Sequence, residues 1–440
     1  MSKGDMKHSS DRAPLRIAVA GLGTVGVGVI HIVQQQGSLL ADRCGRPVEI
    51  TGVSARNRSR DRGVDLSSYP WFDDPVTMAR EAEADLIIEL IGGSDGPAKA
   101  VCEAAIAAGR HVVTANKALM AVHGAALAAA AEGAGVALAY EAGVAGGIPV
   151  VKALREGLAA NRITSLQGIL NGTSNFILTT MRETGRDFGE VLAEAQELGY
   201  AEADPTFDID GTDAAQKLAL LVSLAFGCPV DFDAVAMEGI EQISAQDIKF
   251  AEELGYRIKL LAVARMTENG LERRVAPGMV PMSAPMAHVE GVYNAIVTEG
   301  DFVGRTVMEG RGAGEGPTAS AVVADVLDIA AGRISPVFGV PVERLTACPS
   351  APAEAHVGPY YIRLMVRDRP GVFADIACAL RDAQVSMESV LQRGHNPGET
   401  VPVVMTVHDT QEAAMAAAIA KINALEDIVE PAMVLRIEPA

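Results

Sequence analysis

The sequence of 440 residues has no paired cysteine motif, no long apolar run and no excess of basic charge. Its five cysteines are scattered without any Cys-x-x-Cys, and their odd number argues against a complete disulfide framework, so a reducing cytoplasm is the expected compartment. No apolar run reaches the roughly 18 residues of a membrane span, so no membrane partner is expected. Because 56 acidic residues outnumber 37 basic ones, nucleic acid is not an expected partner either.

The composition that remains is typical of a globular enzyme. Hydrophobic residues make up 49% of the chain and charged residues 21%, and the length predicts roughly two to four domains. Residues 1–13 are polar and charged and lack the apolar core of a signal peptide, so we predict a mobile tail there.

A glycine-rich turn follows the first predicted strand, at residues 15–20. Residues 21–26 have the spacing G-x-G-x-x-G and open a predicted helix. The first glycine permits a tight turn, the second lets a pyrophosphate approach the backbone, and the third allows close packing of helix and strand, while the helix amides hold the anion. The pattern predicts a dinucleotide site whose contacts are Gly21, Gly23, Thr24, Val25 and Gly26.

The residues after the second predicted strand, 48–54, bear on the choice between NAD and NADP. An acid at this strand end would bind the ribose 2'-hydroxyl of NAD, but the sequence has Arg56, Arg58 and Arg60 instead. Guanidinium groups favour a 2'-phosphate, so NADP is the expected cofactor and Arg56 the first candidate ligand. A solvated basic loop is the alternative.

Further strands and helices complete the first domain. Apolar strands are predicted at residues 85–91, 111–115 and 136–140, with an alanine-rich helix at 97–108. This alternation predicts an α/β fold with a doubly wound parallel sheet, which binds ligands at the carboxyl ends of its strands. Lys117 follows one of these strands and is predicted to lie beside the nicotinamide; a surface lysine that caps a loop is the alternative.

Two polar segments follow in the middle of the chain. Residues 141–149 form a glycine-rich bend in which one carboxylate, Glu141, and flexible backbone carbonyls suit a hard cation, although a hinge between domains fits the same pattern. Residues 171–175, Asn-Gly-Thr-Ser-Asn, begin a predicted helix. This polar turn either binds substrate or only caps the helix.

The densest cluster of charge lies at residues 199–218. Asp213 and Lys217 are four residues apart on a predicted helix and therefore share a face. The rest of this helix is apolar and is expected to be buried, and buried charges need partners or a ligand. An ordinary ion pair is the alternative. The loop before the helix holds four more carboxylates, Glu202, Asp204, Asp208 and Asp210.

This acid-rich stretch resembles the signature of the homoserine dehydrogenases, with every spacing kept. The resemblance covers about residues 14 to 345, and no catalytic position departs from the family pattern. The matching positions are Ala195, Gly199, Glu202, Asp204, Pro205, Asp208, Gly211, Asp213 and Lys217, with supporting matches at 21–26, 114–117, 140–142 and 171–176.

The resemblance implies a Rossmann-like dinucleotide-binding domain that is split in sequence and a mixed α+β domain for catalysis and dimerisation. The first domain is predicted at residues 14–145 together with 318–345, and the second at 146–317. The glycine-rich run at 310–316 leads into a predicted helix at 319–330, and Gly316 is a predicted cofactor contact. A homodimer or homotetramer is the implied assembly.

The resemblance also implies an activity, the NAD(P)H-dependent reduction of L-aspartate 4-semialdehyde to L-homoserine in threonine, methionine and isoleucine biosynthesis. In the family pattern Lys217 passes the proton, Asp213 and Glu202 bind substrate, and Lys117 lies where nicotinamide and substrate meet. A structural monovalent cation such as sodium is implied at Glu141, Val144, Gly146 and Ile148.

A carboxyl-terminal module at residues 360–440 follows a proline-rich linker at 346–359. Its predicted strands and helices alternate as βαββαβ, a ferredoxin-like order, and Asp368-Arg-Pro-Gly371-Val372 at the first turn resembles an ACT domain. The helix amides at Gly371 and Val372 would receive the carboxylate of an amino-acid effector. Threonine is the expected effector because the family makes its precursor; a module that only assists oligomerisation is the alternative.

Two other functions compete with this hypothesis. Another Rossmann oxidoreductase could act on a related aldehyde, since the fold alone does not fix the substrate. A non-catalytic sensor would bind the nucleotide without turnover. The presence of Lys217, Asp213 and Glu202 together argues against the sensor.

Overall fold

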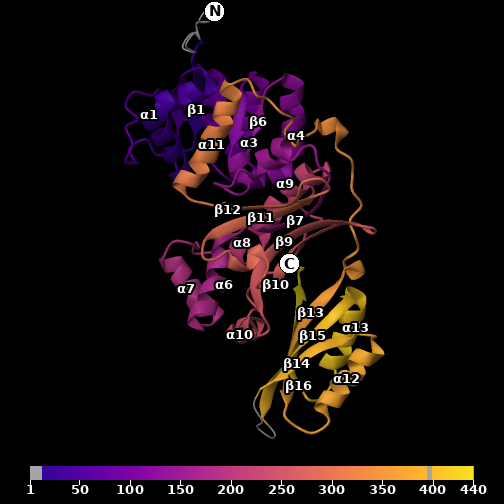
Figure 1. The fold of residues 1–440 in the computed structure, drawn as a ribbon. Coiled ribbons are helices and arrows are strands. Elements are labelled where there is room, and N and C mark those ends of the chain that lie inside the picture. Colours follow the sequence, from indigo (N-terminus) through magenta and orange to yellow (C-terminus); the bar gives the residue numbers. More distant parts are fainter. Residues whose placement is uncertain (1–11, 394–398, 440) are drawn as a thin grey trace, which may run out of the picture. The chain divides into compact units, whose positions relative to one another are not determined.

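The computed structural model describes residues 12–393 and 399–439 (Figure 1). The predicted tail lies almost wholly outside this part of the chain. The first of two compact units runs to Leu166 and includes Ala215–Val235 and Asn294–Ala347, and the second comprises Gln167–Ala214, Ala236–Tyr293 and Cys348–Ala440. Within the described ranges no helix is both long and apolar enough to cross a membrane, and the five cysteines are free.

A parallel six-stranded sheet forms the centre of the first unit. Its strand order is β3-β2-β1-β4-β5-β6, so the predicted doubly wound parallel sheet is confirmed. Every residue of β4 is buried, which explains its continuous apolar sequence. The strands are β1 (Leu15–Ala20), β2 (Val48–Ser54), β3 (Trp71–Phe72), β4 (Leu86–Glu89), β5 (His111–Thr114) and β6 (Leu138–Ala139).

Two helices from distant parts of the sequence lie side by side in this unit, α1 (Thr24–Cys44) and α11 (Glu315–Ala330) (Figure 1). Gly28 permits their contact, because a Cβ at this position would lie 2.9 Å from the Cβ of Ala319. The helix α11 begins earlier than the predicted start at residue 319, since Gly314, with a φ of 113°, turns the chain directly into it.

The other elements of the first unit flank this sheet or follow it in sequence. The helix α2 and the strand β3 were not predicted. A two-residue strand such as β3 has no sequence periodicity of its own. The remaining elements are α2 (Pro75–Glu81), α3 (Pro97–Ala107), α4 (Lys117–Ala134), η1 (Glu141–Gly143), α5 (Val150–Lys152), η2 (Ala153–Gly157), β12 (Gly304–Arg311) and η4 (Val342–Arg344). Three elements, β7 (Ile163–Ile169), α9 (Thr212–Phe226) and β11 (Tyr293–Gly300), run through a boundary between the two units.

The second unit contains a mixed sheet, as predicted. Its centre is a long antiparallel hairpin of β9 (Tyr256–Thr267) and β10 (Gly270–Pro281). On its other edge β10 pairs in parallel with β8 (Ala236–Met237) and with β16 (Ile428–Ile437). The remaining elements before the carboxyl-terminal module are α6 (Gly172–Thr184), α7 (Phe188–Glu197), α8 (Thr206–Ile209), α10 (Ala245–Glu253) and η3 (Pro285–His288).

The carboxyl-terminal module has the predicted βαββαβ order. Its sheet order is β16-β13-β15-β14, with antiparallel neighbours throughout. Alternate residues of β13 such as Tyr360, Ile362 and Leu364 are fully buried in its core. The elements are η5 (Ala353–Ala355), β13 (Val357–Arg367), α12 (Val372–Asp382), β14 (Met387–Gln392), β15 (Thr400–Gln411), α13 (Glu412–Asn423) and β16.

The module is joined to the β9–β10 hairpin by more than the segment at 346–359. The strand β16 runs parallel to β10 at Gly278 and Met279, so both belong to one sheet. Asp247, in the first turn of α10, is completely buried and accepts hydrogen bonds from Arg363 Nε at 2.6 Å and from the Tyr361 hydroxyl at 3.1 Å. Backbone pairing therefore joins the module to the hairpin, and a buried ion pair joins it to α10.

Candidate active site

The glycine turn after β1 is shaped by two close backbone contacts. Gly21 has a φ of 103°, and a Cβ there would lie 2.4 Å from the carbonyl oxygen of Leu90. A Cβ on Gly26 would lie 2.1 Å from the carbonyl oxygen of Gly21. A Cβ on Gly23, in contrast, would meet no atom within 4 Å. The first and third glycines are therefore required by packing, whereas the second leaves the backbone open to a ligand.

The helix α1 starts directly from this turn. Gly23 is its N-cap and supplies no side chain, so the first amides, at Thr24, Val25 and Gly26, receive no side-chain cap. No acidic residue lies in the first turn of this helix. The amides and the positive end of the helix dipole together suit a pyrophosphate.

The strand β2 ends beside the glycine turn, where the Gly21 amide donates to the Ser54 carbonyl at 2.9 Å. Arg56 follows two residues later and is exposed. A ligand that extends from the turn along the end of β2 would therefore reach this guanidinium next.

Arg62 was missed by the sequence analysis but supports the glycine turn. Its guanidinium donates to the carbonyls of Leu22 at 3.1 Å and Asn57 at 2.6 Å, and it lies 5.6 Å from the ring centroid of Trp71. Arg58 approaches the same ring at 5.8 Å. The sequence signal was only a tryptophan downstream of an arginine cluster, which does not reveal a contact between residues that far apart.

The carboxyl ends of β4 and β5 are linked by a chain of hydrogen bonds. The Thr114 hydroxyl donates to the buried carboxylate of Glu89 at 2.6 Å, and the Asn116 amide donates to Thr114 Oγ1 at 3.0 Å. Glu89 also accepts from the Ile91 amide at 2.7 Å, and the Asn116 side chain accepts from the Leu119 amide at 3.0 Å. These bonds fix the strand ends and cap α4.

Lys117 is the first residue of α4 and is half-buried. The helix dipole disfavours a cation at this end of a helix by about 0.3–1 kcal/mol, so helix stability does not explain a lysine here. Its backbone lies beside the glycine-rich bend, because a Cβ on Gly143 would meet Lys117 N at 3.8 Å. Lys117, Gly143 and the end of β5 therefore share one edge of the sheet.

The glycine-rich bend is held by Glu141. Its carboxylate accepts from the amides of Val151 at 2.9 Å and Lys152 at 2.8 Å, and its own amide donates to Asp325 at 2.9 Å. Burial, together with the charge of Asp325, raises the pKa of Glu141 to about 7. Lys152 Nζ lies 3.2 Å from Asp325 and partly offsets these buried acids.

Val144, Gly146 and Ile148 are buried in the same bend. Gly146 has a φ of 53°, and a Cβ there would lie 2.4 Å from the carbonyl oxygen of Gly312, so only glycine fits. One carboxylate and several backbone carbonyls form a donor set suited to a hard cation. Among the described residues no group of three or more His, Cys, Asp or Glu side chains could hold a metal, so such a cation would depend on the carbonyls.

The carboxylates of the acid-rich segment make different kinds of contact. Asp204 accepts from the Thr206 hydroxyl at 2.7 Å at the start of α8, and this bond helps hold the pKa of Asp204 below its usual range. Asp210 accepts from the amide of Thr212, the first residue of α9, at 2.8 Å. These two acids therefore shape the backbone, while Glu202 is exposed. The prediction of an irregular loop missed α8, because a one-turn helix has too few residues for a periodic pattern.

Asp213 and Lys217 lie in the first two turns of α9 and are 4% and 8% exposed. The residues that follow on this helix, such as Leu218 and Leu221, are completely buried. Gly211, just before the helix, has a φ of 92°, and its Cβ position is 3.1 Å from the Val275 side chain. The expectation that two charges enter an apolar, buried helix is thus confirmed.

Asn171, the N-cap of α6, connects two of the acids. Its side-chain oxygen accepts from the Ser174 amide at 2.7 Å. Its Nδ2 donates to Asp208 Oδ1 at 2.7 Å and to Asp213 Oδ2 at 2.9 Å. The sequence analysis left a binding role and a capping role open for this turn, and did not place Asp208 in the site.

The remaining predicted residues lie at helix starts. Gly316 is exposed in the first turn of α11, and a Cβ there would meet no atom within 4 Å. Gly371 is the N-cap of α12 with a φ of 102°, Val372 is buried, and Asp368 is half-buried. The α12 amides are therefore uncapped by a side chain.

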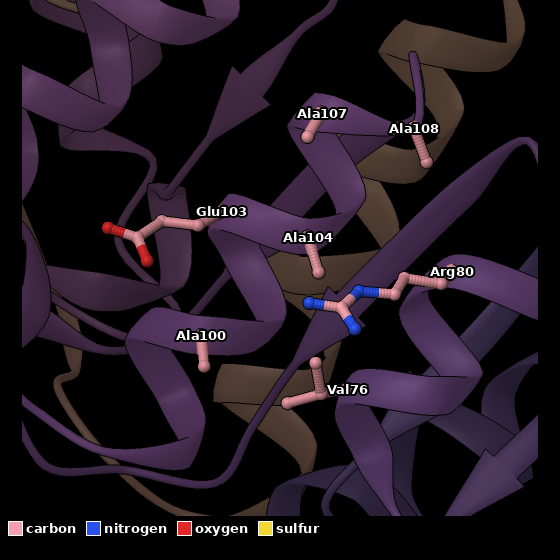
Figure 2. A pocket seen from close by; sticks show the side chains of 7 residues that line it. All are labelled: Val76, Arg80, Ala100, Glu103, Ala104, Ala107 and Ala108. Atoms are coloured by element: carbon pink, nitrogen blue, oxygen red, sulfur yellow. The ribbon is translucent and has the colours of Figure 1, made fainter.

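A hollow of about 440 Å³ between α2 and α3 contains none of the predicted site residues (Figure 2). Arg80 on α2 reaches toward α3, whereas the side chain of Glu103 on α3 points away from Arg80 (Figure 2). Alanines of α3 line the hollow beside them. This surface lacks the convergent polar groups of a catalytic site. Its lining residues are Val76, Arg80, Ala100, Glu103, Ala104, Ala107 and Ala108.

The predicted residues fall on both units. The glycine turn, Arg56, Lys117, the 141–148 bend, Lys217 and Gly316 belong to the first unit, and Glu202, Asp213 and the residues near Gly371 belong to the second. Chemically, the glycine turn suits a dinucleotide, an amine on α9 suits proton transfer, and the acids suit a cationic substrate group.

Sequence comparison assigns the main parts of the chain to known families. The profile described as "Homoserine dehydrogenase, NAD binding domain" matches residues 21–141, "Homoserine dehydrogenase" matches 149–327, and "ACT domain" matches 360–427. The homoserine dehydrogenase of Pseudomonas aeruginosa is 45% identical over 432 residues, covering 97% of this chain and 99% of that protein. That of Bacillus subtilis is 37% identical over 442 residues, covering 96% and 98%.

Solved structures agree with this assignment. A homoserine dehydrogenase from Thiobacillus denitrificans is 45% identical with a TM-score of 0.90, covering 97% of this chain and 99% of that one. A hyperthermophilic archaeal homoserine dehydrogenase in complex with NADPH, 24% identical with a TM-score of 0.60 over 72% of this chain and 97% of that one, shares the fold. The chain therefore belongs to the homoserine dehydrogenase family of NAD(P)-dependent oxidoreductases and carries a C-terminal ACT domain.

Proposed function

We propose that this enzyme reduces L-aspartate 4-semialdehyde to L-homoserine, in the route to threonine, methionine and isoleucine, with Lys217 as proton donor. The observation that carries this proposal is the burial of Asp213 and Lys217 in the first turns of the apolar helix α9. NADPH, when bound at the glycine turn, supplies the hydride. Negative charge then develops on the aldehyde oxygen, and an ammonium within hydrogen-bond reach stabilises this charge and gives up a proton.

The acids and Lys117 are proposed to hold the two charged ends of the substrate. Asp213 and Glu202 bind the ammonium group, because a carboxylate and an ammonium form a charge-assisted hydrogen bond. Lys117, at the sheet edge where strands β4 and β5 end, orients the substrate next to the nicotinamide. The half-buried position of Lys117 at a helix start, which costs helix stability, supports a role in binding.

The five free cysteines support a reducing compartment such as the cytoplasm. A homodimer or homotetramer stays a prediction from the family resemblance. Sedimentation of the purified protein would distinguish either assembly from a monomer.

Lys217→Ala is expected to retain NADPH binding but to lose turnover by on the order of a hundredfold or more, because the proton donor is gone. In the reverse direction lysine must be neutral to accept a proton, so homoserine oxidation by the wild-type enzyme is expected to rise steadily above neutral pH. Steady-state rates at 340 nm and NADPH fluorescence titrations measure these effects. Loss of cofactor binding together with turnover, or a flat pH profile, would contradict the assignment.

Arg56→Ala is expected to raise the KM for NADPH by about ten- to a hundredfold, since a hydrogen bond between charged groups contributes about 1.5–3 kcal/mol. The KM for NADH should stay nearly constant, because NADH lacks the 2'-phosphate. Arg60→Ala removes the same charge from the same exposed loop and serves as the control. An equal rise in the KM for both cofactors would mean that Arg56 acts only through the overall positive charge of the loop.

A monovalent cation such as sodium is proposed at Glu141, Val144, Gly146 and Ile148, where it would offset the buried carboxylates of Glu141 and Asp325. Adding sodium at ten times its Kd should raise the free energy of unfolding by about 1.4 kcal/mol. Thermal unfolding in sodium chloride, compared with tetramethylammonium chloride at the same ionic strength, measures this effect. Glu141→Gln should abolish the difference, and equal stability of the wild-type protein in both salts would refute the site.

Threonine is proposed to inhibit the enzyme by binding at the uncapped start of α12. Asp368→Ala should weaken inhibition by about tenfold, the loss of one charged contact, while the uninhibited rate stays constant. A point variant is preferable to removal of the module, because β16 is part of the β10 sheet. Activity that stays constant at saturating threonine would leave the module with a role in assembly alone.

A further inference from the structure

Asn171 does more than cap a helix. Capping requires only a side-chain acceptor, and Ser, Thr, Asp and Asn serve almost equally well. The Asn171 oxygen meets this need by accepting from the Ser174 amide at 2.7 Å. The amide group at the other side of the same side chain contacts the two acids and has no part in the cap.

The orientation of this amide is fixed by chemistry. A flipped amide would direct its NH2 group toward the Ser174 amide and its oxygen toward two carboxylates, which leaves every contact repulsive. In the orientation found, the two hydrogens of Nδ2 match two acceptors, Asp208 Oδ1 and Asp213 Oδ2. Asn171 is 5% exposed, so water cannot readily replace these bonds.

We infer that Asn171 is a positioning residue, which holds Asp208 and Asp213 close together with both carboxylates ionised and facing a fixed direction. Two neighbouring carboxylates repel each other, and one of them tends to take up a proton. Hydrogen bonds from a neutral donor favour the ionised form of both without adding a competing positive charge. The pair can then present its charge to the substrate ammonium, and in this respect the inference rests on the proposed function.

Other charged groups lie on or beside the helices that this contact joins. Asp210 lies between α8 and α9, Lys217 follows Asp213 on α9, and Glu202 precedes α8. Arg182 lies in the last turn of α6 itself. Asn171 is neutral and donates to two acids at once, Asp208 and Asp213.

Two substitutions separate positioning from capping. Asn171→Ser and Asn171→Asp both keep an oxygen that can cap α6, but neither keeps the two donors. Asn171→Ser should raise the KM for aspartate 4-semialdehyde by about tenfold or more, with a smaller effect on kcat, because a displaced binding group typically costs up to about a hundredfold. In Asn171→Asp the pH profile of kcat/KM should gain an ionisation that the wild-type profile lacks, since three carboxylates cannot all stay ionised.

Asn175→Ser is the matched control. Asn175 is a buried amide one turn along α6, and its Nδ2 donates to the carbonyls of Val289, Gly291 and Tyr293 rather than to acids. This variant should unfold at a lower temperature but keep its KM within about twofold. A KM that rises as much as in Asn171→Ser would show that loosening of α6, not loss of the donors, is responsible.

A measurement independent of turnover completes the test. The carboxyl added in Asn171→Asp is expected to have a pKa raised in the folded state by the two neighbouring acids. Its ionisation therefore costs no stability below its unfolded pKa of about 3.9 and destabilises increasingly as pH rises above that value. The difference in unfolding free energy between Asn171→Asp and wild type should therefore grow between about pH 4 and 8. The difference for Asn171→Ser should grow less, because this variant loses the two donors but adds no carboxyl. The inference would be overturned if the unfolding free energy depended on pH in the same way in all three proteins, or if the KM stayed unchanged in Asn171→Ser. A wild-type enzyme that is inactive on the semialdehyde would contradict the proposed function alone.

Discussion

Burial of charge at the start of α9 is the constraint on which the site depends. An ionised carboxylate in a protein interior is costly unless donors surround it, and Asp213 is 4% exposed. Asn171 meets part of this need and thereby ties the start of α6 to the start of α9. The helix start at Thr212 is set by Asp210 and by the left-handed Gly211. The spacing of residues in the family signature therefore reflects requirements of the backbone as well as those of the reaction.

The sequence predicted those features that are local in the chain. The glycine turn could be predicted because each of its glycines has a local reason. Gly21 and Gly26 face backbone carbonyls that leave no room for a Cβ, and Gly23 faces open space. The parallel strands could be predicted because buried strands are apolar along their whole length. Short elements such as β3 and α8 could not, because their few residues are held by partners elsewhere in the fold.

The contacts that complete the candidate site join residues far apart in sequence. The bonds from Asn171 to Asp208 and Asp213, and from Arg62 to Leu22, span about forty residues each. A single sequence contains no periodicity that reports such a pairing. Residue types still limit the choice, because an amide beside two acids and an arginine beside a carbonyl are complementary in hydrogen bonding.

The last strand of the chain has a consequence for how the protein is made. The strand β16 pairs with β10 at Gly278 and Met279, and the amide of Glu438 donates to the Met279 carbonyl. These partners lie some 160 residues apart in sequence, so β10 is synthesised well before β16. Until β16 has also been synthesised, the part of the β10 edge that pairs with it exposes unpaired backbone groups. Folding of the second unit therefore cannot be completed before β16 is made.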